Sequence, residues 1–263
     1  MAKKLKIGFV GAGNVASHLA EHFFKAGHKI SAIASMSHIS AKNLAEKVNA
    51  AAIGNLSDFP RDLDLIVIAT SDSSVESVSN QLPVSRAIVC HTSGSINLSA
   101  LSNRHKRAAV LYPLQTFSRD IPVDVSIVPF FVEATDESTL SEIEDFAKGI
   151  SSSVYRADSE VRACLHVAGV LSSNFVIYLL EMTRKTLDKA NLPLSTIKPL
   201  IETSISKALT TSPLEAITGP ARRGDITTIR KQSDSINSPY DKAVYDSISE
   251  AILRSFNKDT TIR

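Results

Sequence analysis

A short glycine-rich turn near the N-terminus has the residue types needed to bind a phosphate group. Gly11, Gly13 and Ala16 form a G-x-G-x-x-A pattern between an apolar stretch and an amphipathic one. The first glycine permits a tight turn, the second lets the backbone approach a pyrophosphate, and the small third residue lets helix and strand pack closely. The phosphates would bind at the helix start, around Asn14 and Val15. This context predicts a dinucleotide site, and the alternative is a tight turn without a ligand.

The residues after the second predicted strand bear on the choice between NADP and NAD. An NAD site places Asp or Glu there to accept from the ribose 2′-hydroxyl. This chain has Ser35, Met36, Ser37 and His38 instead. The absence of an acid removes the repulsion of a 2′-phosphate, and the serines with His38 could bind one. The sequence therefore favours NADP. NAD remains possible because no arginine is present here. The alternative is that these residues form a solvated loop that binds no cofactor.

Polar residues follow three further predicted strands. Thr70 and Ser71 come after one, Ser93 and Ser95 after the next, and Gln115 after a third. Ligands of open α/β sheets bind beyond the carboxyl ends of the strands. We therefore expect Thr70 and Ser71 to contact the cofactor, Ser93 to be catalytic and Gln115 to bind substrate. Ordinary turn chemistry is the alternative.

A long helical stretch carries the candidate proton donor. His166, Gly169 and Ser173 share one helical face, and Asn174 lies about 80° round from His166. His166 is the titratable side chain on that face suited to donate a proton near neutral pH. We predict that His166, with Ser93 and Asn174, is catalytic and that Ser173 binds substrate. The alternative for His166 is a hydrogen-bonded core or interface histidine.

The stretch TGPARRGD, residues 218–225, interrupts an otherwise helical region. Its Gly-Pro step breaks a helix. Arg222 and Arg223 would present planar forks suited to a carboxylate or phosphate of the substrate. Asp225 could orient an arginine or cap the next helix. The alternative is a surface turn with solvated charges.

The order of elements predicts how these residues are positioned. Short apolar runs, which read as strands buried on both faces, alternate with amphipathic helical stretches. The alternation predicts an α/β fold with a doubly wound Rossmann sheet. The predicted strands are 5–10, 28–34, 64–70, 86–90, 108–112 and 129–134, and the helices between them end at glycines 27 and 149, among other places.

The second part of the chain is expected to be all helical. Residues 159–190 contain no proline and have apolar residues at helical spacing. Two later stretches, 192–211 and 238–256, show the same pattern. We therefore expect a Rossmann domain over residues 1–156 and a helical dimerisation and substrate domain over 157–263.

Composition excludes several classes of function. The net charge of +2 lacks the large excess of basic residues that is typical of proteins that bind nucleic acid. The two cysteines, Cys90 and Cys164, have no metal-type spacing, so we expect free thiols and no metal site. No uninterrupted apolar run approaches 18 residues, so we expect no membrane span and a cytoplasmic protein.

Several longer motifs carry a family resemblance. KIGFVGAGNVA is similar to the opening of pyrroline-5-carboxylate reductases and deazaflavin-dependent NADP oxidoreductases. With CHTSGS, YPLQTFS, HVAGVLSSNF and TGPARRGD, the chain is identified as a member of a bacterial Rossmann-like family with a C-terminal domain of unknown function 2520. The resemblance implies a Rossmann domain, a helical dimerisation domain and a homodimer. It departs at Tyr112, where the family usually has histidine, and at Met36, where it often has arginine.

The resemblance also bears on chemistry. Related dehydrogenases carry a proton-donating lysine on the helix that corresponds to 159–190, but here the first lysine is Lys185, roughly 29 Å beyond His166. Reduction of an iminium needs no such acid. Pyrroline-5-carboxylate reductases place a loop resembling TGPARRGDITTI at the active site across the dimer.

Together these features predict an oxidoreductase that uses NADP, with NAD possible, to transfer hydride to or from a small anionic substrate. The alternative is a catalytically silent sensor or scaffold that binds a dinucleotide. The missing lysine and Tyr112 favour that alternative, whereas the polar residues at the strand ends and His166 favour chemistry.

Overall fold

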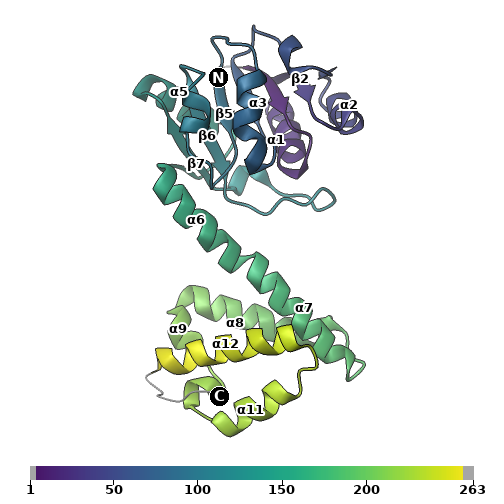
Figure 1. Cartoon of the computed structure of the whole chain (residues 1–263), viewed down its shortest axis with the longest axis vertical. Coiled ribbons are helices and arrows are strands. Elements are labelled where there is room, and N and C mark those ends of the chain that lie inside the picture. Colours follow the sequence, from purple (N-terminus) through teal and green to yellow (C-terminus); the bar gives the residue numbers. More distant parts are fainter. Residues whose placement is uncertain (1–3, 257–263) are drawn as a thin grey trace. The chain divides into compact units, whose positions relative to one another are not determined.

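The computed structural model describes residues 4–256, and the chain divides into two compact units, residues 1–174 and 175–263 (Figure 1). We expected the division at residue 156. It falls instead after helix α6 (Ser159–Ser172), because that helix is anchored to the first unit by the fully buried side chain of Arg162.

The first unit is built on an eight-stranded sheet in the order β3-β2-β1-β4-β5-β6-β7-β8. Neighbouring strands of the described sheet are parallel except β6 and β7. The doubly wound α/β fold is thereby confirmed. Strands β3 and β8 were not predicted, because three residues are too few to show a pattern. The strands are β1 Lys6–Val10, β2 Lys29–Ala34, β3 Ala51–Ile53, β4 Leu65–Ile68, β5 Ile88–His91, β6 Ala108–Pro113, β7 Phe130–Ala134 and β8 Val154–Arg156.

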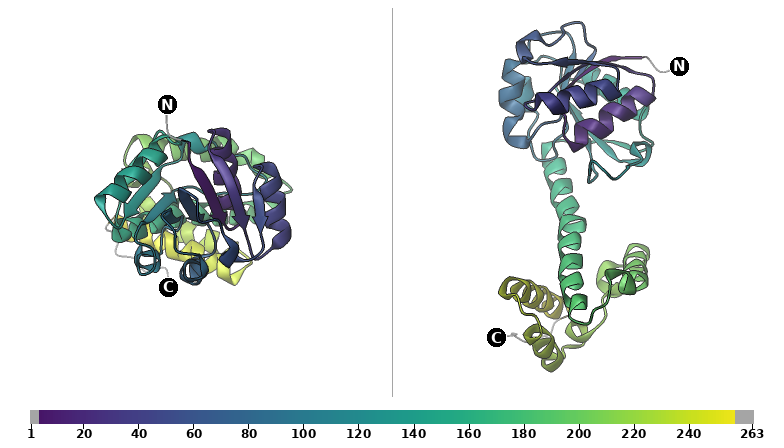
Figure 2. Two further views of the ribbon diagram at one scale, coloured as in Figure 1. Left: turned by 90° about the horizontal axis from the view of Figure 1, so that it is seen from above. Right: turned by 90° about the vertical axis from the view of Figure 1, so that its right-hand side faces the viewer.

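Helices cover both faces of this sheet (Figure 2). On one face α1 (Asn14–Lys25), α2 (His38–Lys47) and α5 (Glu137–Lys148) contribute to one apolar cluster with the strands. On the other face α3 (Val75–Gln81) and α4 (Ser99–Ser102) contribute to a second cluster. Short 3-10 turns, η1 Leu56–Asp58, η2 Asp72–Ser74 and η3 Val125–Ile127, complete the connections.

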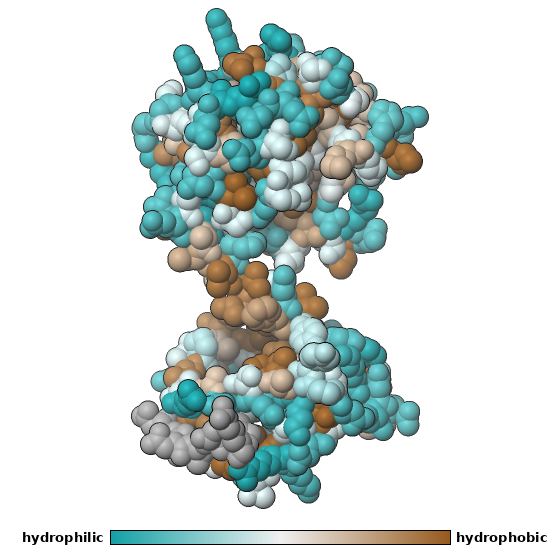
Figure 3. All heavy atoms as spheres, viewed as in Figure 1, coloured by the Kyte–Doolittle hydropathy of each residue, from teal (hydrophilic) through white to brown (hydrophobic). Residues whose placement is uncertain are grey.

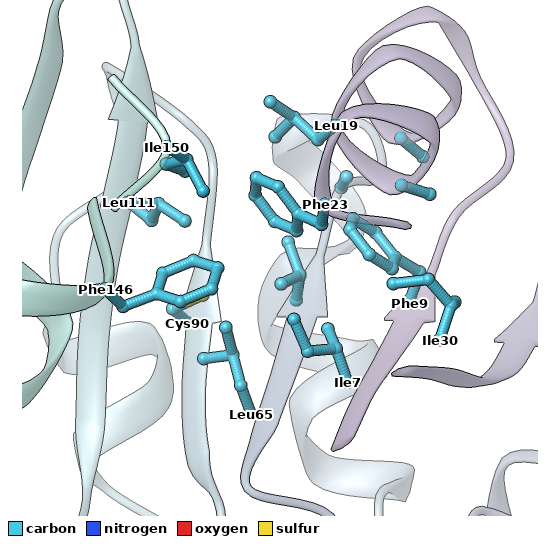
Figure 4. Close-up of a cluster of buried hydrophobic side chains, with 14 of the residues drawn as sticks. Ile7, Phe9, Leu19, Phe23, Ile30, Leu65, Cys90, Leu111, Phe146 and Ile150 are labelled. Carbon is cyan, nitrogen blue, oxygen red and sulfur yellow. The ribbon is translucent and has the colours of Figure 1, made fainter. Parts of the chain in front are cut away.

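Strand β1 shows why both faces are apolar. Its alternate residues point to opposite sides, so Ile7 and Phe9 join the α1 face while Val10 joins the α3 face. In Figure 4, Phe9 lies beside Phe23 of α1, with ring centroids 5.8 Å apart. Gly8 faces the second cluster, where an added Cβ would lie 2.5 Å from the Phe59 ring. The central strand is therefore buried on both sides, as its sequence predicts.

The two glycines expected after helices behave differently. Gly27 follows α1 with a φ of 90°, the left-handed conformation that glycine tolerates best. Gly149 follows α5 with a φ of −74°, which is ordinary right-handed backbone. Both helices end just before the predicted glycines, but only Gly27 has the left-handed conformation.

The expected long helix is interrupted. Helix α6 ends at Ser172 and α7 begins at Asn174 and ends at Asp188 rather than at residue 190. The intervening Ser173 has φ −121° and ψ −72°, and its hydroxyl donates to the Gly169 carbonyl at 2.6 Å. Hydroxyls that bond back to the preceding turn disturb a helix, which accounts for a break at this Ser-Ser-Asn sequence.

The second unit is a small helical assembly that begins with α7. Tyr178 and Lys185 on α7 both donate to Asp241 of α12, at 2.8 and 3.1 Å. Among its residues up to 256, a cluster of buried apolar side chains is formed by Ala221, Ile229 and Leu253. The remaining elements are η4 Leu194–Ile197, α8 Lys198–Thr210, α9 Pro213–Ala216, α10 Pro220–Arg223, α11 Ile226–Asp234 and α12 Pro239–Ser255.

The TGPARRGD stretch is a single helical turn rather than a loop. Helix α10 starts at Pro220, where proline is well suited to the first helical position. Gly219 and Gly224, at either end, have φ angles of 96° and 76°. These left-handed glycines turn the chain sharply on both sides, which isolates the short helix from α9 and α11.

The segment from Ser159 to Asp188 is long and apolar enough to span a membrane by length and composition, with a hydropathy of 1.7 over its most apolar window. The sequence prediction of no membrane span rested on apolar runs and did not include this segment. One such helix is weak evidence for a membrane. Polar Ser172, Ser173 and Asn174 lie near its middle. Hydrophobic residues are exposed on this segment in the single chain (Figure 3), including Val167, Leu171 and Phe175.

Candidate functional site

A cavity of about 660 Å³ lies at the carboxyl ends of β1, β2 and β4. It is lined by seven of the eight residues predicted to bind the cofactor. These are Gly11, Gly13, Asn14, Val15, Ser35, Thr70 and Ser71. Although these residues are spread over three connections in the sequence, the parallel sheet brings them to one edge.

Glycine suits the two positions of the turn for different reasons. Gly11 has a φ of 117°, and a Cβ there would overlap with the carbonyl oxygen of Ala69. Gly13 has no such constraint. Apart from its chain neighbours, no described residue places an atom within 4 Å of a Cβ built on Gly13. A side chain at Gly13 would therefore meet empty space beside the cavity, where a close-lying pyrophosphate fits.

The residues after β2 only partly match the prediction. Ser35 lines the cavity, as does Met36, whose side chain is fully exposed. Ser37 is not one of the described residues that line it. Its hydroxyl accepts from the backbone N–H of Ser40 at 3.2 Å and so caps helix α2. The hydroxyl of Ser37 is thus engaged in capping α2.

Sequence reasoning missed the apolar end of the cavity. Leu56 and Val78 line it, together with the polar residues Asn55 and Gln81. Leu56 follows β3, which is too short to be recognised, so no signal marked the turn after it. An apolar slot with adjacent amides suits a flat heteroaromatic ring such as adenine.

The loop after β6 is fixed to the glycine-rich turn. The Asn14 side chain donates to the Phe117 carbonyl at 3.0 Å, and Arg119 donates to the Ala12 carbonyl at 3.2 Å. Phe117 also lines the cavity. These contacts join residues about a hundred positions apart in the sequence, and only the fold reveals them.

A second cavity, of about 370 Å³, adjoins the first at Val15, which lines both. It brings together the predicted residues His166, Ser173, Asn174 and Gln115. All of them belong to the first unit. The four residues therefore lie around one cavity, and their roles in binding or catalysis remain predictions. The other lining residues are Thr92, Tyr112, Pro113, Leu114, Thr116, Ala168, Gly169, Val170 and Ser172.

Tyr112, which stands where the family usually has histidine, lines this second cavity. Its hydroxyl is 3.5 Å from Nδ1 of His166. The side chain is largely buried, and burial raises the pKa of the phenol above its usual value. A neutral phenol is therefore placed beside the predicted proton donor.

Ser93 has a different role from the predicted one. Its hydroxyl accepts from the backbone N–H groups of Ser95 and Ile96 at 3.1 and 3.2 Å, which closes the turn after β5. Ser93 is not one of the described residues that line the second cavity. Because its oxygen accepts from two backbone donors, this arrangement argues against the predicted catalytic role of Ser93, which stays a prediction.

A buried arginine that the sequence did not reveal holds this turn. Arg162 of α6 donates to the carbonyls of Ser93 and Ile96 at 3.3 and 2.9 Å and pairs with Glu133 at 2.6 Å. His91, fully buried below the turn, accepts from the Ser93 N–H at 3.2 Å. Burial lowers the pKa of His91 to about 4, and the nearby Arg162 charge adds to this effect. His91 is therefore neutral at pH 7.

The two arginines predicted to bind substrate lie in the second unit. Arg222 donates to the carbonyls of Glu215 and Ile217 at 2.7 and 2.6 Å, and its guanidinium lies over the Phe256 ring. This network within the unit argues against the substrate role of Arg222. Arg223 is exposed, and its role stays a prediction. Asp225 caps α11 by accepting from the Thr228 N–H, one of the two roles considered for it.

Comparison with known proteins agrees with this architecture. A Rossmann-like domain model matches residues 1–115, and the domain of unknown function 2520 matches residues 128–252. No curated protein matches the sequence. A solved structure of a candidate NADP oxidoreductase from Bacteroides fragilis is 31% identical with a TM-score of 0.88, and the match covers 95% of this chain and 98% of that one.

More distant structures share the fold alone. The 1-pyrroline-5-carboxylate reductase of Streptococcus pyogenes is 16% identical with a TM-score of 0.66, covering 98% of this chain and all of that one. A reductive aminase from Aspergillus terreus, solved with NADPH and ethyl-5-oxohexanoate, is 14% identical with a TM-score of 0.74, covering 99% and 97% of the two chains. Identity and coverage with the Bacteroides protein, together with the two domain models, show that the chain belongs to the family of Rossmann-like proteins that carry the domain of unknown function 2520.

Proposed function

We propose that this protein is an NADP(H)-dependent oxidoreductase that reduces or oxidises a small anionic substrate by hydride transfer. The observation that carries the proposal is the pair of adjoining cavities. One contains the glycine-rich turn with open space beside Gly13, and the other contains His166, Gln115 and Asn174. The description of the Bacteroides fragilis relative as a candidate NADP oxidoreductase supports the same reaction class.

The first cavity fits a dinucleotide in each of its parts. Gly13 allows the pyrophosphate to approach the start of α1, and Leu56 and Val78 add apolar side chains to the lining, which suit an adenine ring. No carboxylate follows β2 at positions 35–38, so a 2′-phosphate meets no repulsion from that stretch. The bound cofactor would supply the hydride, while the residues of the second cavity hold the substrate.

The second cavity fits a small ligand with polar groups. The Gln115 side-chain oxygen accepts from the Thr116 N–H at 2.7 Å, which leaves the Gln115 amide nitrogen as a donor. The Ser173 hydroxyl shares its proton between the Gly169 carbonyl at 2.6 Å and the Asn174 side-chain oxygen at 3.1 Å, and no described residue takes the Asn174 amide nitrogen as a donor. Two amide donors together with His166 suit a carboxylate, and the volume of about 370 Å³ suits a molecule of few carbon atoms.

Thermal shift measurements with NADPH, NADP, NADH and NAD, followed by turnover assays, test this function. A ligand that binds only the folded protein raises its melting temperature. We expect NADPH to give the largest shift and to bind at least about tenfold more tightly than NADH, a difference of about 1.4 kcal/mol. A tenfold preference for NADH would contradict the NADP assignment, and no binding of either would contradict the oxidoreductase.

Binding without turnover would favour the alternative, a sensor or scaffold that keeps the dinucleotide site. The panel for turnover should contain short 2-oxo acids and cyclic imines, because both are small, polar and reducible. A decrease in the NADPH absorbance at 340 nm with any member of the panel would identify an oxidoreductase rather than a sensor or scaffold.

We also propose that the protein is a soluble cytoplasmic homodimer. In the second unit none of the residues of α7 or α8 is buried within the single chain, although both helices carry large apolar side chains. Leu171 and Phe175, on the two sides of the α6–α7 break, are each 55% exposed. Burial against a second copy would remove this surface from water, and the polar Ser173 and Asn174 between them disfavour a lipid environment.

A further inference from the structure

The contact between Tyr112 and His166 lies in the substrate cavity and involves no part of the dinucleotide site. Tyr112 belongs to β6 and His166 to α6, and both line the second cavity. The phenol oxygen and the imidazole Nδ1 are 3.5 Å apart. Catalytic hydrogen bonds are often long before substrate binds and shorten in the complex.

The Tyr112 ring is held in place from several sides. It packs so closely on the turn after β5 that a Cβ at Gly94 would lie 2.6 Å from its Cζ atom. The Phe131 ring of β7 lies beside it, with centroids 6.3 Å apart. The turn itself is fixed by Arg162 through the Ser93 and Ile96 carbonyls. The position of the hydroxyl is therefore determined by the fold rather than by free rotation.

We propose that Tyr112 is the catalytic proton donor of this protein and that His166 replaces the proton it gives. The inference rests on the proposed reductase function. The proton donor is then the buried and fixed side chain of Tyr112, and the exposed His166 exchanges protons with solvent.

A hydride from the reduced nicotinamide dinucleotide forms a bond to the substrate carbon, and the π electron pair of the C=O or C=N bond moves to oxygen or nitrogen. The Tyr112 O–H bond breaks and its proton binds that atom. The phenolate then takes a proton from the His166 imidazolium, which regains one from water.

The surroundings suit this role. A phenol is protonated at neutral pH, and burial raises the pKa of Tyr112 further, while the charges of Arg162 and Asp72 act on it in opposite directions. The His166 ring of α6 lies beside the Tyr112 ring, with centroids 6.5 Å apart. A protonated donor of this kind transfers its proton only when the accepting atom becomes strongly basic, as it does when hydride is added.

Two probes separate proton donation from a structural role. Reduction of a short 2-oxo acid requires a proton, whereas reduction of the N-methyl-1-pyrrolinium cation requires only hydride. We expect Tyr112→Phe to lower kcat for the oxo acid by about 10²- to 10⁴-fold while changing kcat for the cation by no more than about threefold. The matched control is Tyr155→Phe, since Tyr155 is an exposed tyrosine that stacks on the other side of Phe131.

Each outcome has a clear meaning. Equal losses with both probes, or no loss with the oxo acid, would overturn the donor role of Tyr112. A wild-type protein that reduces only the cation would also overturn it, because no proton is then delivered. A wild-type protein that binds NADPH and reduces no member of the panel would instead contradict the proposed function and with it this step.

A second readout does not depend on activity. In protein with ¹⁵N-labelled histidine, the His166 signal is assigned by its loss in His166→Gln. We expect Tyr112→Phe to move the Nδ1 resonance of His166 at constant pH and Tyr155→Phe to leave it in place. An unmoved resonance in Tyr112→Phe would show that the two side chains do not form a pair.

Discussion

At the scale of single residues, the glycine-rich turn shows two different uses of glycine. Gly11 is required by the protein itself, since its φ of 117° and its approach to Ala69 leave no room for a side chain. Gly13 is not required by any contact within the described chain. The two positions therefore separate the stability of the fold from the binding of a ligand.

We expect Gly13→Val to weaken NADPH binding at least about a hundredfold, or about 2.7 kcal/mol, while the melting temperature of the free protein stays nearly unchanged. The valine side chain would fill the space that the pyrophosphate needs. Gly11→Ala is the contrasting variant, and it should lower the melting temperature as well. Fluorescence titration and thermal unfolding measure both quantities. Undiminished affinity in a folded Gly13→Val protein would sink the dinucleotide assignment.

The buried His91 predicts a pH dependence of stability. Its pKa is lowered to about 4 in the folded protein, mainly by burial, and is about 6.5 in an unfolded chain. Between these values the unfolded state binds more protons, so the free energy of unfolding decreases as the pH falls from 6.5 to 4. The full difference is on the order of 3 kcal/mol.

Urea unfolding at pH 7 and pH 5 measures this effect. His91→Gln should reduce the loss of stability between the two pH values, since glutamine does not titrate. His38→Gln, at an exposed histidine on the surface, is the control and should leave the loss as in the wild type. An unchanged pH dependence in His91→Gln would assign the loss to other groups.

At the scale of elements, helix α6 is joined to the sheet by a buried ion pair. Arg162 is fully buried and meets Glu133 of β7 at 2.6 Å, and it also binds two carbonyls of the turn after β5. One side chain thus fixes the helix that carries His166 to the turn that supports Tyr112. Such a pair adds little by itself to stability, but breaking it leaves a buried charge without its partner.

We expect Glu133→Gln to reduce the free energy of unfolding by about 3 kcal/mol, because Arg162 keeps its charge in the core. A matched substitution, Glu137→Gln, removes an exposed partner of Arg156 and should cost less than about 1 kcal/mol. Chemical denaturation compares the two variants. If both variants lose the same small free energy of unfolding, water has access to Arg162 in solution and the ion pair is not a buried one.

At the scale of the whole molecule, the proposed dimer accounts for apolar surface that neither unit buries. Exposed apolar residues occur on α6, α7 and α8, and the hydrophobic stretch of 159–188 is visible in Figure 3. A globular monomer rarely leaves such a surface in contact with water. A second copy is the proposed partner because the second unit has so few buried apolar residues of its own.

Sedimentation analysis tests the dimer. Leu171→Glu with Phe175→Glu should convert a dimer to monomer at micromolar concentration or prevent soluble expression, since each charge would enter the interface. Ile39→Glu, an exposed apolar position on α2, is the control and should stay dimeric. A wild-type protein that sediments as a monomer, or that partitions into lipid vesicles, would contradict the proposal.

The Rossmann sheet, most of its helices and the glycine-rich turn could be predicted from the sequence. These features rest on local patterns: short apolar runs that alternate with amphipathic stretches, glycines at a fixed spacing and polar residues just after strands. The tertiary structure decided what depends on contacts between distant residues. Arg162 is one arginine among many until the fold buries it against Glu133, and Tyr112 looks like a substitution for histidine until it lies beside His166. In the same way, the hydroxyls of Ser37 and Ser93 turned out to be committed to a helix cap and a turn. Local patterns record backbone preferences, whereas the partner of a side chain is set by how the chain packs.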